Sequence, residues 1–204
     1  MFEFVEKAVY INLESRTDRR IQIEEELSVF PRNKVIRFNA IKEWNGHHGC
    51  SKSHIAVLEM AIKENWSNVL IIEDDAKWNK FDMGYAILEK LTKSPYDVIS
   101  LGGIGGYVEP DTFKAFNFQT ATAYLVSNHY YNTLLTNFKE GLKILMASET
   151  YHSTGCLDQH WKQLQFKDNW FRIYPHLLYQ RASYSDIIKD HVDYTGPKHF
   201  DITD

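Results

Sequence analysis

The sequence has few cysteines and carries no long run of one charge. Its two cysteines, Cys50 and Cys156, are too few for a disulfide framework and fit no zinc-binding spacing, so we expect both to be buried thiols. No basic run is longer than Arg19-Arg20, and the formal net charge is -4 with a pI near 6.1. A nucleic-acid partner, which would need a basic surface, is therefore not expected.

Long apolar runs are missing as well. The first residues have no basic start followed by an apolar stretch, so no signal peptide is expected. No stretch approaches the roughly 20 apolar residues that cross a bilayer, so we expect no transmembrane segment and a soluble, cytoplasmic chain. With 204 residues and 44% apolar content, the sequence can bury one core, which predicts a single domain over residues 1–204. Whether the chain is part of a longer protein stays open.

The most informative stretch is residues 69–75, which read VLIIEDD. Its four apolar residues predict a strand buried on both faces, and three acids follow where the strand would leave the core. Because side chains alternate along a strand, Glu73 and Asp75 should share a face, about 6 to 7 Å apart at roughly 3.3 Å per residue, while Asp74 points the other way. Such crowded carboxylates suit Mg²⁺ or Mn²⁺. A solvated turn or a helix N-cap explains them equally well.

Strands and helices are expected to alternate along the chain. The predicted strands cover residues 8–13, 34–38, 69–72, 97–101, 120–126 and 170–174. The predicted helices cover residues 17–27, 52–65, 81–91, a segment around Tyr130 and Leu135, and 157–164. The predicted caps are Thr17 for the first, Ser51 for the second and Ser127 for the fourth, and the last opens with Asp158. Residues 42–49 are a predicted loop, and residues 141–155 indicate no clear element. The alternation predicts an α/β fold, a mostly parallel central sheet flanked by helices on both faces, with ligands beyond the carboxyl ends of its strands.

Three arginines fall at the start of the first predicted helix. Arg16, Arg19 and Arg20 lie where the helix macrodipole disfavours cations, and a bound anion would offset that conflict. Pairing with Asp18 and Glu24 on a solvated face is the alternative, and locally the better one. The predicted ligand edge of the sheet would collect these arginines with the acids of the central strand.

Other features allow two interpretations. His54 borders the apolar stripe of its predicted helix, which is typical of a satisfied core histidine rather than a ligand. The loop residues His47 and His48 stay unassigned. Residues 102–106, with four glycines, would let the backbone approach a ligand, but a flexible hairpin or lid explains them equally well. From Gln180 onward the chain is polar and is expected to fold over a site or to be partly mobile.

Six short pieces then stand in a defined order along most of the chain. They are Tyr10-Ile11-Asn12-Leu13 with Arg16, Asp18 and Arg19; Gly49-Cys50 with Ser53-His54; residues 70–75; residues 97–102; Asp158 within Cys156-Leu157-Asp158-Gln159; and Tyr174-Pro175 with Gln180 and Ser185-Asp186-Ile187. Each is weak alone, but the ordered set resembles glycosyltransferase family 25, the lipopolysaccharide-type and procollagen galactosyltransferase group. One departure is His47-His48, which replaces an acid that often precedes the Gly-Cys pair.

The resemblance implies a GT-A fold with a Rossmann-like nucleotide-binding half, and a Mn²⁺-type ion, or Mg²⁺, held by a DxD-like motif. The implied reaction moves a hexose, galactose or glucose first, from a UDP-sugar to a glycan or protein hydroxyl. Carried over by position, Asp75 is the main metal ligand with Glu73 beside it, and Asp158 is the catalytic carboxylate near the acceptor. The donor-binding residues that the resemblance implies are Asn12, Arg16, Arg19, Ser53, His54, Glu73 and Asp74.

The chemistry is consistent with this assignment. Breaking a bond between a sugar and a phosphate requires the leaving diphosphate to be neutralised, which a cation does as a Lewis acid. If the anomeric carbon is inverted, Asp158 could deprotonate the acceptor hydroxyl; if configuration is retained, it would only orient the acceptor, and a helix N-cap is the structural alternative. A further metal ligand could come from His176, His191, His199 or Asp186.

Two other functions remain open on the sequence. Metal-assisted phosphoryl transfer or hydrolysis also needs acids beyond a strand, although no P-loop and no Ser or Cys nucleophile motif is present. An inactive GT-A-like carbohydrate-binding or scaffold domain would keep the fold without the chemistry. Metal-dependent binding of UDP would favour the transferase.

Overall fold

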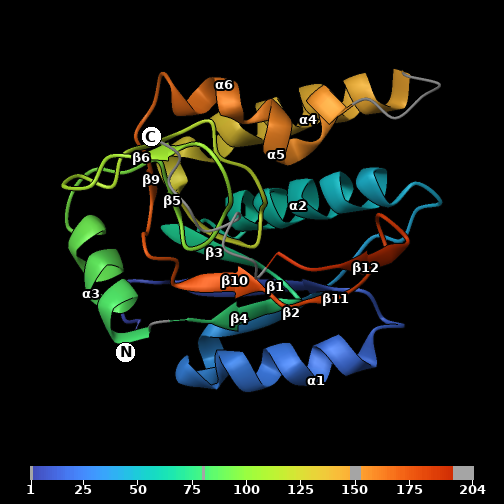
Figure 1. The fold of residues 1–204 in the computed structure, drawn as a ribbon, viewed down its shortest axis with the longest axis horizontal. Helices are drawn as coiled ribbons and strands as arrows, with labels where there is room; N and C mark the ends of the chain where they lie inside the picture. The colour runs from blue at the N-terminus through green and yellow to red at the C-terminus, as the bar shows by residue number, and fades with distance from the viewer. Residues whose placement is uncertain (1, 80, 148–152, 195–204) are drawn as a thin grey trace.

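The structure, a computed structural model, describes residues 2–79, 81–147 and 153–194 (Figure 1). The central sheet contains β1 (Lys7–Asn12), β2 (Val35–Asn39), β3 (Asn68–Glu73), β5 (Val98–Ser100), β8 (Ala123–Ser127) and β9 (Trp170–Arg172), in the order β2-β1-β3-β8-β5-β9. The helices are α1 (Thr17–Glu26), α2 (Gly46–Lys63), α3 (Phe81–Leu91), α4 (Tyr131–Ala147), α5 (Leu157–His160) and α6 (Lys162–Gln165). Short 3-10 turns span Leu27–Val29, Arg32–Lys34, Asn128–Tyr130 and Ser153–Gly155.

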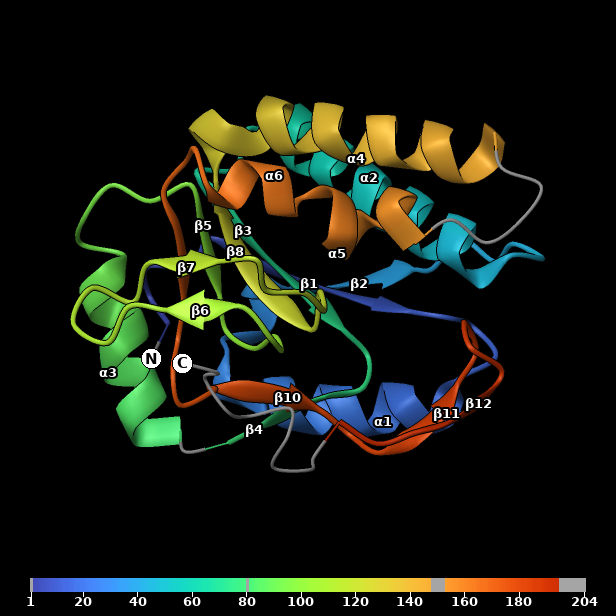
Figure 2. The same ribbon diagram turned by 45° about the horizontal axis from the view of Figure 1, so that its top comes forward.

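Helices cover both faces of this sheet, as the sequence predicted. Figures 1 and 2 show α2 and α4, with α5 and α6, on one face and α1 on the other. The alternation of side chains along β3 supplies both cores: Val69 and Ile71 pack toward α2 and α4, while Leu70 and Ile72 pack toward α1 and α3. The predicted α/β class with a mostly parallel sheet is confirmed.

One strand of the sheet runs against the others. β8 pairs antiparallel with both β3 and β5, whereas β1–β2, β1–β3 and β5–β9 are parallel pairs. The cause lies in the connection from β5 to β8, because residues 101–122 contain no helix that could carry the chain back across the sheet. The chain therefore enters β8 at the end of the sheet where β5 finished, and β8 runs in the opposite direction.

Three small strand pairs lie outside the central sheet. They are β4 (Ala76–Trp78) with β10 (Leu178–Gln180), β6 (Tyr107–Val108) with β7 (Ala115–Phe116), and β11 (Ser183–Ser185) with β12 (Asp190–Val192), all antiparallel. The glycine-rich residues 102–106 lead into the β6–β7 hairpin, which is one of the two interpretations that the sequence left open. The polar stretch after Gln180 forms the β11–β12 hairpin and lies against the first turns of α1 and α2 (Figure 1).

Several predicted helix starts were wrong. α2 begins at Gly46 rather than after Ser51, because the Asn45 side chain accepts a hydrogen bond from the backbone N–H of His47 and caps the helix. Residues 46–49 of the predicted loop are therefore the first turn of α2. Thr17 is the first residue of α1 and not its cap. Ser127 does occupy the predicted N-cap position, before the turn Asn128–Tyr130 that leads into α4, but its side chain makes no capping hydrogen bond.

The last helices also differ from the prediction. α4 continues through Gly141 to Ala147, within the range for which the sequence indicated no element. The predicted helix 157–164 begins at Leu157 and is divided at Trp161 into α5 and α6. No helix within the described ranges is long and apolar enough to cross a membrane.

Candidate functional site

A cavity of about 570 Å³ lies beyond the carboxyl ends of β1 and β3. Its walls come from residues 40–44, the first half of α2, the acids that follow β3, the start of α5 and the β11–β12 hairpin. This is the edge at which an open α/β sheet is expected to bind its ligand. The acids of the central strand thus face a cleft and not bulk solvent.

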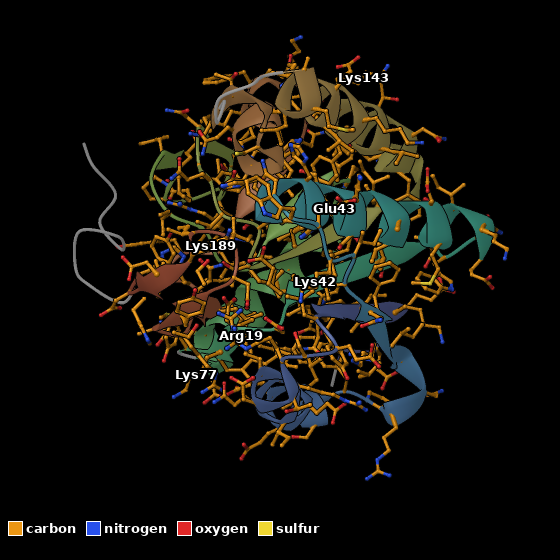
Figure 3. All side chains as sticks on the ribbon, turned by 90° about the vertical axis from the view of Figure 1, so that its right-hand side faces the viewer. Arg19, Lys42, Glu43, Lys77, Lys143 and Lys189 are labelled. Atoms are coloured by element: carbon orange, nitrogen blue, oxygen red, sulfur yellow. The ribbon has the colours of Figure 1, made fainter. Side chains whose placement is uncertain are left out.

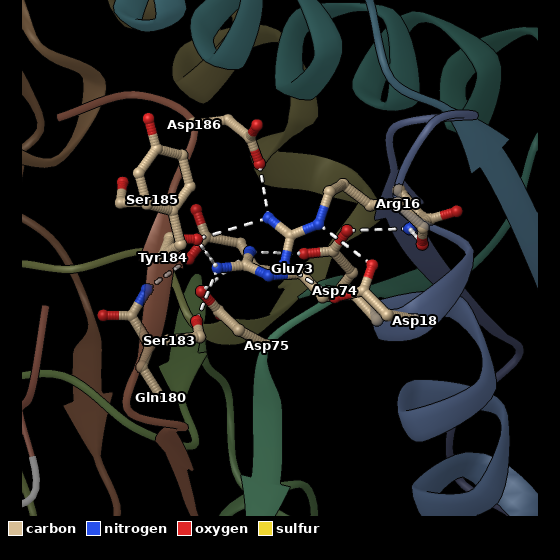
Figure 4. Close-up of polar contacts among 12 residues, drawn as sticks. Arg16, Asp18, Glu73, Asp74, Asp75, Gln180, Ser183, Tyr184, Ser185 and Asp186 are labelled. Carbon is tan, nitrogen blue, oxygen red and sulfur yellow. Dashed lines mark hydrogen bonds and ion pairs between the residues drawn. The ribbon is translucent and has the colours of Figure 1, made fainter. Parts of the chain in front are cut away.

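Glu73 is directed toward α2. It follows Val69 and Ile71 in the alternation of β3, so its side chain emerges on the face that α2 covers. Its Oε2 accepts a hydrogen bond from Gln180 Nε2 at 2.8 Å, and its Oε1 lies 3.8 Å from His54 Nε2. Figure 4 shows Gln180 reaching the acidic cluster from β10.

Asp74 is directed toward α1, as predicted from the alternation. Its Oδ1 accepts a hydrogen bond from Arg19 Nη1 and its Oδ2 one from Asn12 Nδ2, both at 2.8 Å. Burial raises the pKa of Asp74 in spite of the nearby Arg19 charge. Asn12 is itself buried and donates to the Arg16 carbonyl as well, so it supports Asp74 from behind the cavity wall.

One carboxylate oxygen of Asp75 has no hydrogen-bond partner among the described residues. Its Oδ2 lies 3.1 Å from Arg19 Nη1, while its Oδ1 is buried without a hydrogen-bond partner in the structure. Burial, followed by the negative charge of Glu73, raises the pKa of Asp75 to about 7 against the opposing effect of Arg19. Near neutral pH this carboxyl group therefore exchanges readily between a protonated and an ionised form.

Asp158 lies at the same cavity, at the start of α5, on the face of the sheet that α2 also covers. Its Oδ2 accepts a hydrogen bond from the backbone N–H of Thr120 at 3.0 Å, and the N-cap position of α5 is Cys156 rather than Asp158. Burial raises the pKa of Asp158, and the charge of Glu73 adds to this effect. Tyr194 also lines the cavity, and burial together with the charges of Asp158, Glu73 and Asp75 raises its pKa.

The β11–β12 hairpin closes one side of the cavity and is fastened to α1. Arg16 Nη1 lies 2.5 Å from Asp186 Oδ2, while the Arg16 fork also holds Asp18 (Figure 4). Arg19 Nη2 donates to Ser183 Oγ at 2.6 Å and to the Tyr184 carbonyl at 2.9 Å. Arg16 and Arg19 thus both contact protein acceptors. Arg20 pairs with Glu24 on an exposed helix face, as the solvated-face alternative predicted, whereas Arg19 is buried against the acids after β3.

The first half of α2 supplies the opposite wall. Cys50, Ser53 and His54 all line the cavity. Ser53 Oγ donates to the Gly49 carbonyl and accepts from the backbone N–H of Ile41, so it joins the wall to the preceding segment. His54 is 1% exposed, and its Nδ1 lies 2.7 Å from the hydroxyl of Tyr124 on β8.

Most of the predicted site residues meet at this cavity. The residues that line it are Arg19, Ser53, His54, Glu73, Asp74, Asp75 and Asp158. Asn12 and Arg16 lie behind its wall, and the glycine-rich residues 102–106 are not among its lining residues. Of the further ligand candidates, Asp186 also lines the cavity but pairs with Arg16. His176 is buried elsewhere, His191 lies on β12 outside the lining, and His199 is outside the described residues.

Sequence reasoning gave no role to three contributors. Gln180 and Tyr194 reach the acids from the polar end of the chain, whose main signal was its composition. Cys50 was expected to be a buried thiol, yet it is only half-buried and faces the cavity, while Cys156 is buried as predicted. A longer predicted α2 would have placed Cys50 one turn before His54 on the same helix face.

One family model matches part of the chain. Residues 44–133 match the family model described as glycosyltransferase family 25 (LPS biosynthesis protein), which confirms the resemblance seen in the sequence. A search of curated protein sequences finds no match.

Among solved structures, a glycosyltransferase involved in the glycosylation of the major capsid of PBCV-1 is similar, with a TM-score of 0.50, 9% identity and coverage of 87% of this chain and 93% of that chain. Mannose-1-phosphate geranyltransferase from Thermus thermophilus has a TM-score of 0.48 with 9% identity, covering 83% of this chain and 73% of that one. A 4-diphosphocytidyl-2C-methyl-D-erythritol synthase from Anaerococcus prevotii has a TM-score of 0.47 with 11% identity, covering 91% and 77%. At these sequence identities the likeness concerns the fold alone. The similarity to the glycosyltransferase of PBCV-1 capsid glycosylation supports a GT-A-like fold.

Proposed function

We propose, with the match to glycosyltransferase family 25 as the premise, that this protein is a metal-dependent hexosyltransferase. It would transfer a hexose, galactose or glucose first, from a UDP-sugar to a hydroxyl group of a glycan or protein acceptor. The observation that carries the proposal is the meeting of Glu73, Asp75 and Asp158 at one cavity beyond the carboxyl ends of the parallel strands. Open α/β sheets bind their ligands at this edge, and a cluster of acids there favours a ligand that includes a cation.

The residues present fit a hard divalent cation. Asp75 Oδ1 is buried without a hydrogen-bond partner in the structure, which is costly for a carboxylate unless a cation or a proton supplies the contact. Glu73 adds a second carboxylate on the same cavity, and Mn²⁺ or Mg²⁺ prefers such oxygen ligands together with substrate phosphates. When bound there, the ion would neutralise the leaving diphosphate as a Lewis acid.

The chain's own residues would perform the remaining steps. Lys42 and Lys189 lie on the same side of the molecule as Arg19 (Figure 3), and both line the cavity, so their ammonium groups can meet phosphate oxygens. Asp158, whose pKa burial raises, is suited to accept the proton of the acceptor hydroxyl if the reaction inverts. In a retaining reaction the same carboxylate would orient that hydroxyl.

The rim of the cavity offers a surface for the acceptor. Trp44 is 90% exposed there, and Lys189 Nζ lies 5.2 Å from the centroid of its ring. An exposed indole at the mouth of a polar cavity is suited to stacking against a sugar ring. We therefore assign Trp44, with Asp158, to the acceptor side, and Glu73 and Asp75 to the donor side.

Calorimetric titration of the full chain with UDP, with and without Mn²⁺, tests the donor side. We expect metal-dependent binding that Asp75→Ala weakens by at least about tenfold, equivalent to about 1.4 kcal/mol. Asp18→Ala is the matched control, because Asp18 is an acid in the first turn of α1 that does not line the cavity. Equal UDP affinity in Mn²⁺ for the wild type and Asp75→Ala would reject the assignment.

A donor screen that measures released UDP tests the reaction. Asp158→Asn is expected to keep UDP affinity and to lower transfer by roughly 100-fold, the scale of lost acid–base catalysis. Full residual turnover would remove Asp158 from the catalytic residues. Turnover of phosphate esters without sugar transfer would support the phosphoryl-transfer alternative, and metal-independent glycan binding without turnover would support the scaffold alternative.

A further inference from the structure

A second group of ligating atoms lies on the α2 side of the cavity. Within the described part of the chain, the Sγ of Cys50, a ring nitrogen of His54 and a carboxylate oxygen of Glu73 all lie within 4.8 Å of one another. His54 Nε2 and Glu73 Oε1 are 3.8 Å apart. Asp75, the predicted metal ligand, belongs to no such group of three among these residues.

Two elements place these atoms together. Cys50 and His54 are four residues apart on α2, so their side chains share one face of the helix, one turn apart. Glu73 ends β3, and the strand's alternation directs it to the same helix. The group therefore rests on a long helix and a central strand, which hold its geometry more firmly than a loop would.

The nitrogen ligand His54 and the oxygen ligand Glu73 are each oriented by a neighbouring polar side chain. The Tyr124 hydroxyl lies 2.7 Å from His54 Nδ1, which fixes the ring and leaves Nε2 directed at Glu73. Gln180 Nε2 holds Glu73 Oε2 at 2.8 Å, which leaves Oε1 available. Partners of this kind orient the ligands in metal sites, and their loss typically weakens metal binding roughly 10- to 100-fold.

The donor set selects the class of ion. Mn²⁺ and Mg²⁺ prefer oxygen ligands, whereas a thiolate with an imidazole and one carboxylate is typical of zinc-class ions. Zinc–sulfur bonds of about 2.3 Å and zinc–nitrogen bonds of about 2.0–2.1 Å require a modest contraction of the observed spacing. Three protein ligands at the wall of a cavity leave a fourth position open to it.

We infer that Cys50, His54 and Glu73 form a binding site for a thiophilic divalent cation of the zinc class, which shares Glu73 with the hard-cation position but does not include Asp75. Binding forms the Sγ–metal bond and releases the thiol proton of Cys50 to solvent. Such a site could bind its ion whether or not the protein performs the proposed transfer reaction. Because Glu73 belongs to both positions, an ion in this site would compete with Mn²⁺ for that carboxylate.

Cobalt titration of the full chain, with a reductant that contains no thiol, tests the site directly. We expect one equivalent of Co²⁺ to produce a thiolate-to-cobalt charge-transfer band, and Zn²⁺ to abolish it. Cys50→Ser should remove the band, whereas Cys156→Ser, the matched control that removes the chain's other thiol, should retain it. No band in the wild type, or a band lost in Cys156→Ser and kept in Cys50→Ser, would overturn the inference.

Two further variants distinguish a site from a lone reactive thiol. His54→Gln and Glu73→Gln keep Cys50, and each should weaken Co²⁺ binding by at least about tenfold. Circular dichroism of each variant checks the fold, and unchanged Co²⁺ affinity in both folded variants would contradict the inference. Asp75→Ala should retain the cobalt band while losing Mn²⁺-dependent UDP binding, so failure of this site and failure of the proposed function give different results.

Discussion

Replacement of Arg19 by Met should have the largest effect on stability of any single change in the cavity wall. Arg19 is 9% exposed, and its Nη1 lies 2.8 Å from Asp74 and 3.1 Å from Asp75. Its Nη2 donates to Ser183 and to the Tyr184 carbonyl, so one guanidinium group joins α1, the acids after β3 and the β11–β12 hairpin. Methionine keeps much of the volume and removes every one of these contacts.

The expected magnitude follows from burial. Removing one partner of a buried ion pair costs about 3–5 kcal/mol, because the other charge stays buried without compensation. We expect a loss in this range for Arg19→Met near pH 8. Arg20→Met is the matched control: the neighbouring Arg20 is exposed and pairs with Glu24 along the helix surface, where solvent screens the interaction and little stability is lost.

The loss should depend on pH with a defined sign. Burial and Glu73 raise the pKa of Asp75 to about 7 with Arg19 in place, and loss of the Arg19 charge raises it further. The folded variant therefore binds more protons than the unfolded chain, so its stability falls as the pH rises through 7. Below that range Asp75 is neutral in the folded state and no longer needs the cation, so the difference from the wild type shrinks.

Urea denaturation followed by tryptophan fluorescence at about pH 5 and about pH 8 measures this directly. The difference in free energy of unfolding between Arg19→Met and the wild type should be larger at the higher pH. A loss for Arg19→Met no greater than that for Arg20→Met, or one that does not change with pH, would refute the reasoning.

Three further predictions concern the rim, the hairpin and the start of α2. Trp44→Ala should raise the acceptor KM by about 3- to 10-fold, the scale of one aromatic contact, with kcat nearly unchanged in steady-state assays. Asp186→Ala removes the 2.5 Å contact to Arg16 and should speed limited proteolysis within the β11–β12 hairpin, leaving the thermal midpoint nearly unchanged. Gly49→Ala would place a Cβ 2.5 Å from the Ile41 carbonyl oxygen and should lower the free energy of unfolding in urea by about 1–3 kcal/mol.

Local patterns predicted the central part of the fold well. The apolar run before Glu73 specified a strand buried on both faces, and the alternation beyond it separated Glu73 from Asp74 correctly. These predictions needed only the two-residue period of a strand. The position of Asp158 at the same cavity followed from the expected ligand edge of a parallel sheet.

Features set by distant contacts could not be predicted in the same way. The start of α2 depends on one Asn45 side chain, which outweighs the two glycines that indicated a loop. β8 is antiparallel to β5 because no crossover helix lies between these two strands, and local sequence patterns did not predict that absence. The two strands of the β11–β12 hairpin are only three residues long, too short for a clear pattern in the sequence. The hairpin is held by Arg16 and Arg19, which lie more than 160 positions earlier in the chain.

The charge balance of the cavity indicates how these parts depend on one another. The charge of Glu73 raises the pKa of both Asp75 and Asp158, while Arg19 is shared between Asp75 and Asp74. At neutral pH a proton on Asp75 is one way to relieve the excess negative charge, and a bound divalent cation is another. If the cation takes the place of that proton, binding of Mn²⁺ with UDP near pH 7 must release protons. Calorimetry in two buffers of different ionisation enthalpy would detect the release, and it should disappear in Asp75→Asn; equal heats in both buffers for the wild type would mean that Asp75 is not the group at which the exchange occurs.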